Sequence, residues 1–286
     1  MIKPTISCKL ARPAALVLFV AAGIAQAQVS DQPGSANATP QPRNTLFVSD
    51  LDYPHLAVGG GWATQIVVVN MSVPQVAVHY TLRFYDGNGH AISLPFDDGS
   101  GNVTYLAVVN QTIQPNGEQN FTFPNLGSLQ VGHAVLSYQE ANTNSGPGPM
   151  LGGYSVFQSY YGGGNQVQYE AAVPLSGSDS ALYLAFWTFN GFESGIALAN
   201  PADSSTTINL YAYDNLGNFL LQDHFVLPPL GHTAFAMGGT YSQLRNRRGA
   251  LYITSSNGYL SAVGLRFAPT GSFTTIPIMN WLGMFN

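Results

Sequence analysis

The sequence predicts an all-β protein built from two tandem antiparallel β-sandwich units. Three observations support this fold class: short runs alternate apolar with polar residues, Gly, Asn, Asp and Pro turns separate the runs, and several segments recur later in the chain. Alternation with a period of two buries one side of a strand, and recurrence in a fixed order indicates duplicated units. Helical periodicity is almost absent.

A signal peptide is predicted to precede the first unit. Met1–Ala27 begins with basic residues, continues through the apolar stretch Ala14–Ile24 and ends with small residues around Gln26. This layout is typical of secretion and cleavage, and the apolar stretch is short for a membrane span. The mature chain is therefore expected to start near Gln28, to be exported to the periplasm, the outer surface or the medium, and to contain no integral membrane segment. The alternative is an uncleaved segment that remains as an anchor.

Cleavage removes the single cysteine, Cys8, and three of the nine basic residues. The mature chain then has six arginines against 14 acidic residues, a net charge of −8, and no cysteine. Disulfides, thiolate metal sites and cysteine nucleophiles are thereby excluded. Nucleic acid is not an expected partner, because phosphate binding needs clustered cations. We interpret the one cluster, Arg245, Arg247 and Arg248, as a solvated turn.

Residues 28–43 are predicted to form a flexible leader, because they are rich in Pro, Ser, Gln and Asn and lack apolar periodicity. The first sandwich unit is expected over residues 44–176. Its clearest strand, Val76–Phe84, alternates apolar with polar side chains, so one of its faces is predicted to be buried. The following Asp86–Gly89 contains residues that tolerate positive φ, as a tight hairpin requires.

The second unit, residues 177–286, is predicted from the internal repeat. Five segments of the first unit match five segments of the second in the same order. The matched pairs are Ile66–Asn70 with Ile196–Asn200, Tyr80–Gly89 with Ile208–Gly217, Pro115–Phe121 with Pro229–Phe235, Gly132–Tyr138 with Gly249–Ser255, and Ala171–Leu175 with Thr274–Ile278. Two Gly-, Asn- and Pro-rich insertions lengthen the first unit, and we expect both to be surface loops.

Strand number and turn spacing indicate sandwiches of immunoglobulin-like kind, although the cysteine pair of antibody domains is absent. Gly239–Asn246 is the exception to the β pattern and is expected to form one short helix. The apolar C-terminal tail, Trp281–Phe285, lies beyond the last repeat match. It is expected either to pack on the second sandwich or to dock into a partner as an added strand.

Several motifs resemble a repeat module found in uncharacterised secreted bacterial proteins. The resemblance rests on Pro54–His55, Gly59–Trp62, Leu82–Asp86, Gly152–Phe157, Gly264–Phe267 and Phe273–Pro277. It implies export and a β-sandwich of immunoglobulin-like type, and it implies no particular activity. The second unit departs from the pattern, because Gly191–Gly195 replaces the Gly-Gly-Gly-Trp segment of the first. The two units are therefore not required to bind the same ligand.

The sequence contains no pattern typical of an enzyme active site. Histidines are scattered singly along the chain, without an HExxH, a GxSxG or a pair at metal-ligand spacing. They are His55, His79, His90, His133, His224 and His232. The sequence therefore favours a non-enzymatic protein without a cofactor. A hydrolase with a site between the units would require a histidine and a carboxylate to meet across the inter-unit cleft.

Calcium is the one metal for which the sequence offers donors. Asp97, Asp98 and Asn102 supply oxygen atoms in a loop that also contains two glycines. No glutamate follows at EF-hand spacing, so an unliganded polar hairpin is the alternative interpretation.

Aromatic residues in Gly-rich turns are the best candidates for ligand contact. Tyr160 and Tyr161 precede three glycines, and Trp187, Phe189 and Phe192 surround a second Gly-containing turn. Such rings stack on sugars or peptides, or they cover the sandwich ends and the interface between the units. We therefore expect an exported tandem β-sandwich with a structural, adhesive or recognition role toward an extracellular glycan or protein. A carbohydrate-binding module that uses these exposed aromatics is the alternative.

Overall fold

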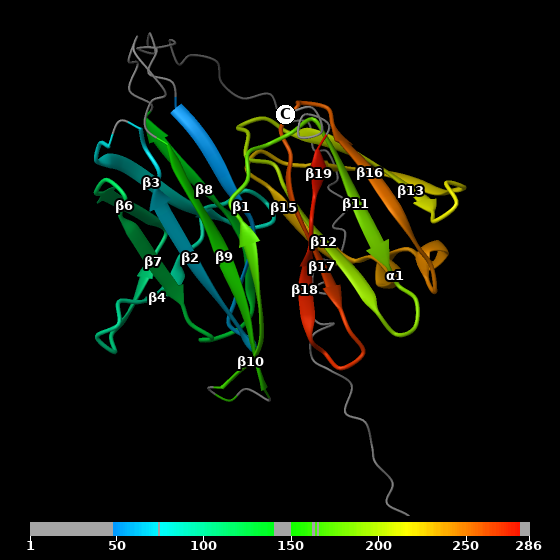
Figure 1. Ribbon diagram of the computed structural model, residues 1–286, viewed down its shortest axis with the longest axis horizontal. Helices are drawn as coiled ribbons and strands as arrows, with labels where there is room; N and C mark the ends of the chain where they lie inside the picture. The colour runs from blue at the N-terminus through cyan, green and yellow to red at the C-terminus, as the bar shows by residue number, and fades with distance from the viewer. Residues whose placement is uncertain (1–47, 74, 140–149, 162–163, 165, 281–286) are drawn as a thin grey trace, which may run out of the picture.

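The computed structural model describes residues 48–73, 75–139, 150–161, 164 and 166–280 (Figure 1). These residues form strands in several antiparallel sheets, which confirms the predicted all-β class. The predicted signal peptide, the leader and the apolar tail lie outside the described residues. Within the described ranges, no helix has the length and apolar character needed to cross a membrane.

The first half of the structure, residues 48–176, contains two sheets that pack around one core (Figure 1). The sheets have the orders β1-β8-β3-β6 and β10-β9-β2-β7-β4-β5. The strands are β1 (Val48–Val58), β2 (Trp62–Asn70), β3 (Val78–Tyr85), β4 (Leu94–Asp97), β5 (Val103–Leu106), β6 (Val108–Ile113), β7 (Glu118–Phe123), β8 (Gln130–Gln139), β9 (Leu151–Tyr160) and β10 (Val167–Pro174). Phe84, Phe123 and Leu136 are fully buried between these sheets.

The second half, residues 177–280, contains two further sheets around a second core. Their orders are β14-β13-β16-β11-β19 and β15-β12-β17-β18. The strands are β11 (Ala181–Trp187), β12 (Glu193–Ala199), β13 (Thr206–Asp214), β14 (Phe219–Leu227), β15 (His232–Ala236), β16 (Arg248–Ser255), β17 (Ser261–Phe267), β18 (Phe273–Ile276) and β19 (Met279–Asn280). Leu184, Ile196 and Leu251 are fully buried in this core.

The two halves share one strand order. The order β1-β8-β3-β6 of the first half corresponds to β11-β16-β13-β14 of the second. In the other pair of sheets, β10-β9-β2-β7 corresponds to β18-β17-β12-β15. The segments matched in sequence lie on strands that are equivalent under this mapping. The first half adds the β4–β5 hairpin between β3 and β6, whereas β13 leads directly into β14.

In antibody domains the first two strands share a sheet, whereas here β1 and β2 lie in different sheets.

Two side-chain hydrogen-bond motifs also recur. The Thr64 hydroxyl bridges the backbone of Ala57, donating to its oxygen at 2.8 Å and accepting from its nitrogen at 3.1 Å. Ser194 bridges the backbone of Trp187 in the same way, at 3.2 and 2.8 Å. Each hydroxyl ties the first strand of its half to the second. In each case one hydroxyl satisfies both backbone polar groups of a residue on the first strand.

A buried asparagine then ends the second strand of each half. Asn70 donates to the backbone oxygens of Val76 at 2.8 Å and Gln114 at 3.1 Å. Asn200 donates to those of Ser204 at 2.7 Å and Pro228 at 2.8 Å. Each side chain therefore holds the turn that follows it against a neighbouring loop, because the amide satisfies carbonyl groups that the turn leaves unpaired.

The helix expected over Gly239–Asn246 is shorter and begins earlier. An α-helix covers Met237–Thr240, and a 3-10 turn covers Ser242–Leu244. Tyr241 separates the two in an extended conformation, with φ −112° and ψ 104°. The two glycines of the helix are poor helix formers. The Tyr241 hydroxyl also donates to Asp223 of β14 at 2.8 Å, which holds this residue against the sheet rather than in a continuing helix.

A third apolar cluster joins the two halves. It includes Trp62, Phe157 and Val173 of the first half with Leu265 and Phe273 of the second. The rings of Trp62 and Phe273 lie 5.3 Å apart. In Figure 1, β12, β17 and β18 lie between the first half and the sheet that contains β11, β13 and β16. That sheet therefore turns its outer face away from the first half.

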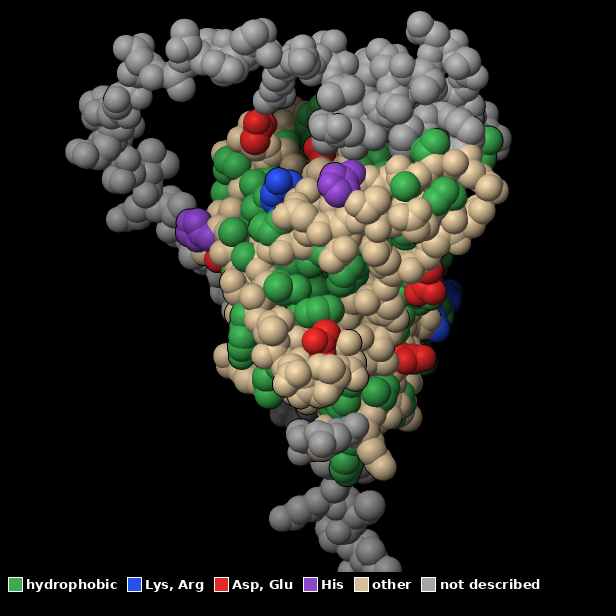
Figure 2. All heavy atoms as spheres, turned by 90° about the vertical axis from the view of Figure 1, so that its left-hand side faces the viewer, with side chains coloured by type: hydrophobic (Ala, Val, Ile, Leu, Met, Phe, Trp, Pro, Cys, Tyr) green, Lys and Arg blue, Asp and Glu red, His purple; other side chains and the backbone are tan. Residues whose placement is uncertain are grey.

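The opposite side of the molecule belongs to the first half (Figure 2). It shows apolar side chains distributed among polar groups and backbone, with few charged side chains. This surface agrees with a chain in which only 8% of residues are charged.

Candidate functional site

The contact between the halves contains a buried polar network. Asp52 and His133 come from the first half, and Ser261 comes from the second. The His133 Nδ1 atom lies 2.9 Å from Asp52 Oδ1, and its Nε2 atom lies 2.9 Å from the backbone oxygen of Leu230. The Ser261 hydroxyl donates to the other oxygen of Asp52. All three side chains are at most 1% exposed.

Both ring nitrogens of His133 face oxygen acceptors, so the geometry favours an imidazolium paired with an aspartate. Burial alone lowers the pKa of His133, but the charge of Asp52 and the hydrogen bonds to Asp52 and Leu230 outweigh it and raise that pKa. This pair links the strands β1 and β8 to the loop before β15 in the second half. The hydrogen bonds of His133 to Leu230 and of Ser261 to Asp52 cross between the halves and hold the two surfaces in one register.

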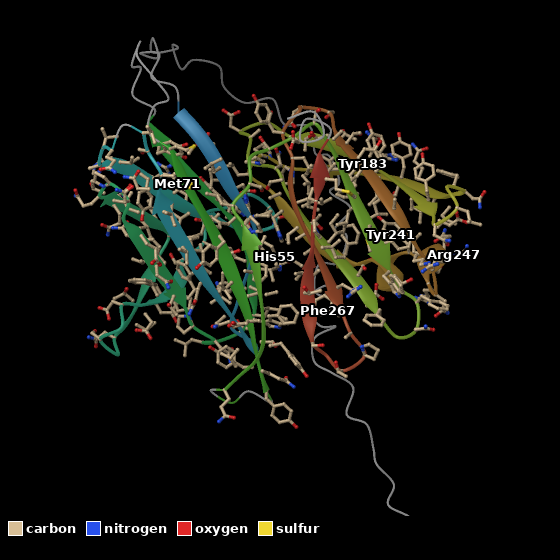
Figure 3. All side chains as sticks on the ribbon, in the orientation of Figure 1. His55, Met71, Tyr183, Tyr241, Arg247 and Phe267 are labelled. Atoms are coloured by element: carbon tan, nitrogen blue, oxygen red, sulfur yellow. The ribbon has the colours of Figure 1, made fainter. Side chains whose placement is uncertain are left out.

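Two further histidines extend this network. His55 Nδ1 and His232 Nε2 lie 3.0 Å apart, and their rings stack with centroids separated by 5.1 Å. His55 lies between the two halves in Figure 3. Burial lowers the pKa of His55 to about 3. Burial, and then the neighbouring charges of His55 and His133, lower the pKa of His232 well below its usual value.

The network does not have the geometry of a nucleophile with its base. The Ser261 hydroxyl contacts a carboxylate, and the nitrogens of His133 contact Asp52 and a carbonyl oxygen. A catalytic serine instead donates to an imidazole that the carboxylate orients. Side chains this deeply buried also have no surface on which a substrate could lie. We therefore assign the network to the packing of the halves.

The open surface of the second half carries a row of tyrosines. Tyr211, Tyr252 and Tyr183 are direct neighbours across β13, β16 and β11, and Met279 of β19 continues the row. The rings of Tyr183 and Tyr252 stack with centroids 4.7 Å apart, and those of Tyr211 and Tyr252 with centroids 6.0 Å apart. All three tyrosines are partly exposed, because alternation directs them outward while their strand neighbours enter the core.

A second row lies four residues further along the same strands. Trp187 pairs with Arg248 across β11 and β16, and the Arg248 guanidinium lies 5.4 Å from the centre of the indole. Between the two rows, Ala185 of β11 pairs with Ala250 of β16. Four strand residues span about 13 Å. The two rows therefore lie on either side of this alanine pair on the outer face of the sheet.

We call this surface, with Tyr183, Tyr211, Tyr252, Trp187 and Arg248, the aromatic face. Tyr213 neighbours Ala250 on β13, so the row between the two aromatic rows consists of Tyr213, Ala250 and Ala185. Its ring contacts that of Phe219 at 5.9 Å, and Phe219 is 59% exposed. The aromatic face therefore offers several ring surfaces on an open, nearly uncharged sheet face.

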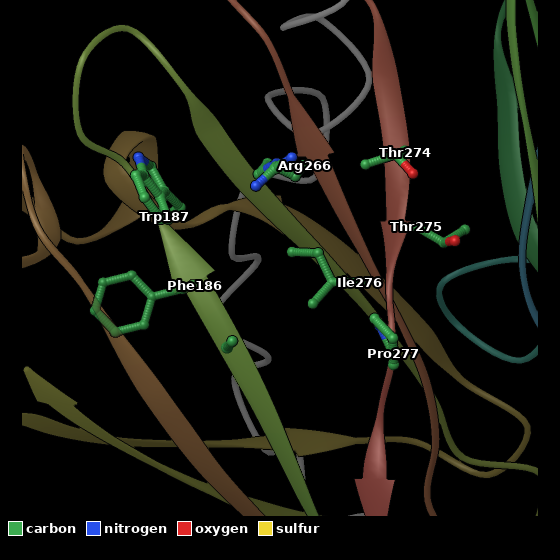
Figure 4. A pocket seen from close by; sticks show the side chains of 8 residues that line it. Phe186, Trp187, Arg266, Thr274, Thr275, Ile276 and Pro277 are labelled. Carbon is green, nitrogen blue, oxygen red and sulfur yellow. The ribbon is translucent and has the colours of Figure 1, made fainter. Parts of the chain in front are cut away.

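A pocket opens beside Trp187, where β11 and β18 diverge (Figure 4). It has a volume of about 230 Å³ and a mostly apolar lining. Its residues are Ala185, Phe186, Trp187, Arg266, Thr274, Thr275, Ile276 and Pro277. Figure 4 shows Trp187 and Arg266 at one end and Pro277 at the other. We call it the fork pocket; Trp187 belongs both to it and to the aromatic face.

The predicted aromatic residues separate into two places. Trp187 and Phe192 come together, with ring centroids 6.2 Å apart, and the Trp187 indole donates to the backbone oxygen of Phe189 at 3.1 Å. Phe189 is 44% exposed. Tyr160 and Tyr161 lie on a different hairpin, at the end of β9 in the first half, where Tyr161 is 72% exposed.

The residues predicted to bind calcium form the turn between β4 and β5. Asp97 accepts from the Gly99 backbone nitrogen at 2.8 Å, and Asp98 accepts from that of Ser100 at 2.8 Å. The Asn102 amide donates to the Ser100 hydroxyl at 2.9 Å. Among the described residues, no three His, Cys, Asp or Glu side chains are grouped to hold a metal ion. The polar side chains of this loop stabilise its own turns.

Sequence reasoning missed Asp52, Ser261 and the tyrosine row. Alternation in Ala181–Trp187 and Thr206–Asp214 already placed Tyr183 and Tyr211 outward, so those tyrosines were detectable as exposed aromatics. Their stacking depends on the pairing of β13 and β11 with β16, which the sequence does not specify. Asp52 meets Ser261 across 209 positions of the chain, and no local pattern signals such a contact.

No protein-family model and no curated protein matches this chain.

Proposed function

We propose that the protein is an exported, non-enzymatic recognition protein that binds an extracellular polysaccharide on the aromatic face. In this proposal the chain is a tandem of two β-sandwich units, of immunoglobulin-like kind in the broad sense of two packed antiparallel sheets. The first unit supports the second, and the second carries the binding surface.

The observation that carries the proposal is the cross-strand row of stacked tyrosines on the same sheet face as Trp187, with an alanine pair between them. Sugar rings present flat patches of C–H groups that pack on aromatic rings, while their hydroxyls bond to groups at the rim. Tyrosine hydroxyls serve that second purpose. An open sheet face accepts a chain that continues beyond it on both sides, which fits a polymer better than a small molecule.

The first test is a glycan-array screen of the chain from Gln28 onward, with and without calcium. We expect selective binding to polysaccharides, and the double variant Trp187→Ala with Tyr252→Ala should weaken it about tenfold to a hundredfold. Tyr161→Ala is the matched control, because it removes an exposed aromatic ring from the other half. Equal loss with the control variant, or binding unaffected by the double variant, would contradict the aromatic face as the site.

The alternative is a structural or adhesive role in which the aromatic face contacts a protein. It is distinguished by the same variants. If the role is structural or adhesive, the protein binds no glycan on the array, and the double variant instead changes self-association or adhesion.

A further inference from the structure

The positive charge of the described residues is concentrated around the β11–β12 turn. They contain five arginines and no lysine, although the whole chain is acidic. Four of the five, Arg245, Arg247, Arg248 and Arg266, belong to this end of the second half. On the strand ladders, Arg248 pairs with Trp187 and Arg266 pairs with Ser194. The backbone oxygen of Arg247 accepts a hydrogen bond from the Thr188 backbone N–H at 2.8 Å. The fifth, Arg83, is exposed on β3 in the first half.

In the described part of the chain, none of these four arginines has a carboxylate within ion-pair distance. Arg245 interacts with Glu193, which also accepts from the Gly238 backbone nitrogen at 2.8 Å. Arg247 interacts with Asp214. Arg248 and Arg266 are positioned by aromatic rings. Their guanidinium groups lie over the rings of Trp187 and Phe192, at 5.4 and 5.3 Å.

Stacking on a ring positions an arginine without using its hydrogen bonds. The N–H groups around the guanidinium plane stay available for a carboxylate, which they bind with two parallel bonds. Arg266 lines the fork pocket, where Trp187 forms a wall and Ile276 and Pro277 supply an apolar surface. The pocket therefore combines an aromatic wall, an apolar floor and a preoriented cation.

From this arrangement we propose that the fork pocket binds one carboxylate-bearing sugar ring, a uronate, of the polymer held on the aromatic face. Arg266 binds the carboxylate, Trp187 packs on the ring, and Thr274, the cross-strand neighbour of Arg266 on β18, offers a hydroxyl to the sugar. The volume, about 230 Å³, is below the roughly 300–1,000 Å³ of pockets for drug-sized ligands and suits a single ring. This inference rests on the proposed function and specifies its ligand class.

The experiment compares one polymer in two charge states on the full mature chain. Polygalacturonate and its carboxyl-reduced product have the same linkage and length and differ in the carboxylates. We expect the charged polymer to bind about tenfold to a hundredfold more tightly, with an affinity that falls as salt is added. Arg266→Gln should remove that preference, whereas Arg83→Gln, the matched control in the other half, should leave it unchanged.

Two further variants keep the test valid if Arg266→Gln loses packing on Phe192. Arg266→Lys keeps the charge without the bidentate fork and should restore part of the preference. Thr274→Trp places a bulky side chain beside Arg266 without changing charge and should reduce uronate binding. Equal affinity for both polymers, or a preference that survives Arg266→Gln, overturns the inference even if Trp187→Ala still weakens binding. Binding that is insensitive to the Trp187 and Tyr252 variants overturns the proposed function itself.

Discussion

The outer faces of two equivalent sheets differ most clearly in one row of side chains. In the second half the row is Tyr211, Tyr252 and Tyr183, which are ladder neighbours. The equivalent row of the first half is Arg83, Val135 and Asp52, with the same ladder pairing. The strand pairing is thus the same in the two sheets, whereas the side chains that it positions are different.

The burial of the two rows explains this difference. Asp52 is 1% exposed because the second half covers it, together with His133, the residue equivalent to Ala250. In the second half the corresponding positions remain open, and they carry tyrosines and an alanine. One copy of the sheet therefore uses this surface to hold its neighbour, and the other copy leaves it available for a ligand. The predictions below test that division.

The largest effect is expected from breaking the buried ion pair of the first half. Asp52→Ala leaves the His133 imidazolium buried without its counter-ion, which should lower the free energy of unfolding by about 3–5 kcal/mol. Tyr183→Ala, at the equivalent position of the open face, should change it by less than about 1 kcal/mol. Urea unfolding of the mature chain measures both. Similar losses for the two variants would show that the faces do not differ in this way.

Acid should weaken the contact between the halves through His55 and His232. Both have lowered pKa values in the fold, that of His55 being about 3, so below pH 6.5 the unfolded chain binds protons that the folded chain does not. Their contribution is present above pH 6.5 and is lost as the pH falls toward 3. At about 1.4 kcal/mol per pH unit, His55 loses about 2 kcal/mol between pH 6.5 and 5, and His232 adds to this loss.

His133 acts in the opposite sense. The pKa of His133 is raised in the fold, so its contribution to stability is fully present below pH 6.5. That contribution is lost as the pH rises through the pKa of the folded protein. Thermal unfolding from pH 5 to 8 measures the balance of the three histidines. His232→Asn should reduce the slope below pH 6.5. A midpoint that does not change between pH 7 and 5 would contradict this assignment.

Equal effects are expected where the halves are alike. Asn70→Ala and Asn200→Ala each remove the side chain that bonds the following turn, so buried backbone oxygens lose their donors. We expect each to lower the free energy of unfolding by about 2–3 kcal/mol. A large difference between the two variants would indicate that one turn has found other partners. Leu216→Ala, at a 79% exposed position of the β13–β14 turn, is the control and should have little effect.

Much of the fold followed from local patterns in the sequence. Alternation and turn residues predicted strands such as Val76–Phe84, and the observed strand β3 spans Val78–Tyr85. The structure places the five repeated segments on strands that correspond between the halves. These features depend on neighbouring residues, so a single sequence contains them. The short helix was misplaced because Tyr241 is held by Asp223, an interaction between separate elements.

The candidate site was predictable only in part. Trp187 and Phe192 were found because a Gly-containing turn carries them, and the structure brings their rings together. Arg248 was interpreted as part of a solvated turn, whereas it lies over Trp187. That contact arises from the register of β11 with β16, which places Trp187 opposite Arg248 across 61 positions of the chain. Register between distant strands depends on the whole core, so local pattern does not reveal it.

A modest effect on stability should accompany a clear effect on binding. Tyr252 is the central ring of the tyrosine row, and Val135 occupies the equivalent position of the first half. Tyr252→Ala removes two ring contacts from an open face, so it should cost about 1–2 kcal/mol of stability. Polysaccharide affinity should nevertheless fall about threefold to tenfold, whereas Val135→Ala should leave it unchanged. Because the two positions share one backbone geometry, a loss of affinity with both variants would point to a general change of fold. A loss with Tyr252→Ala alone would place the binding surface on the half whose equivalent face is not used for packing.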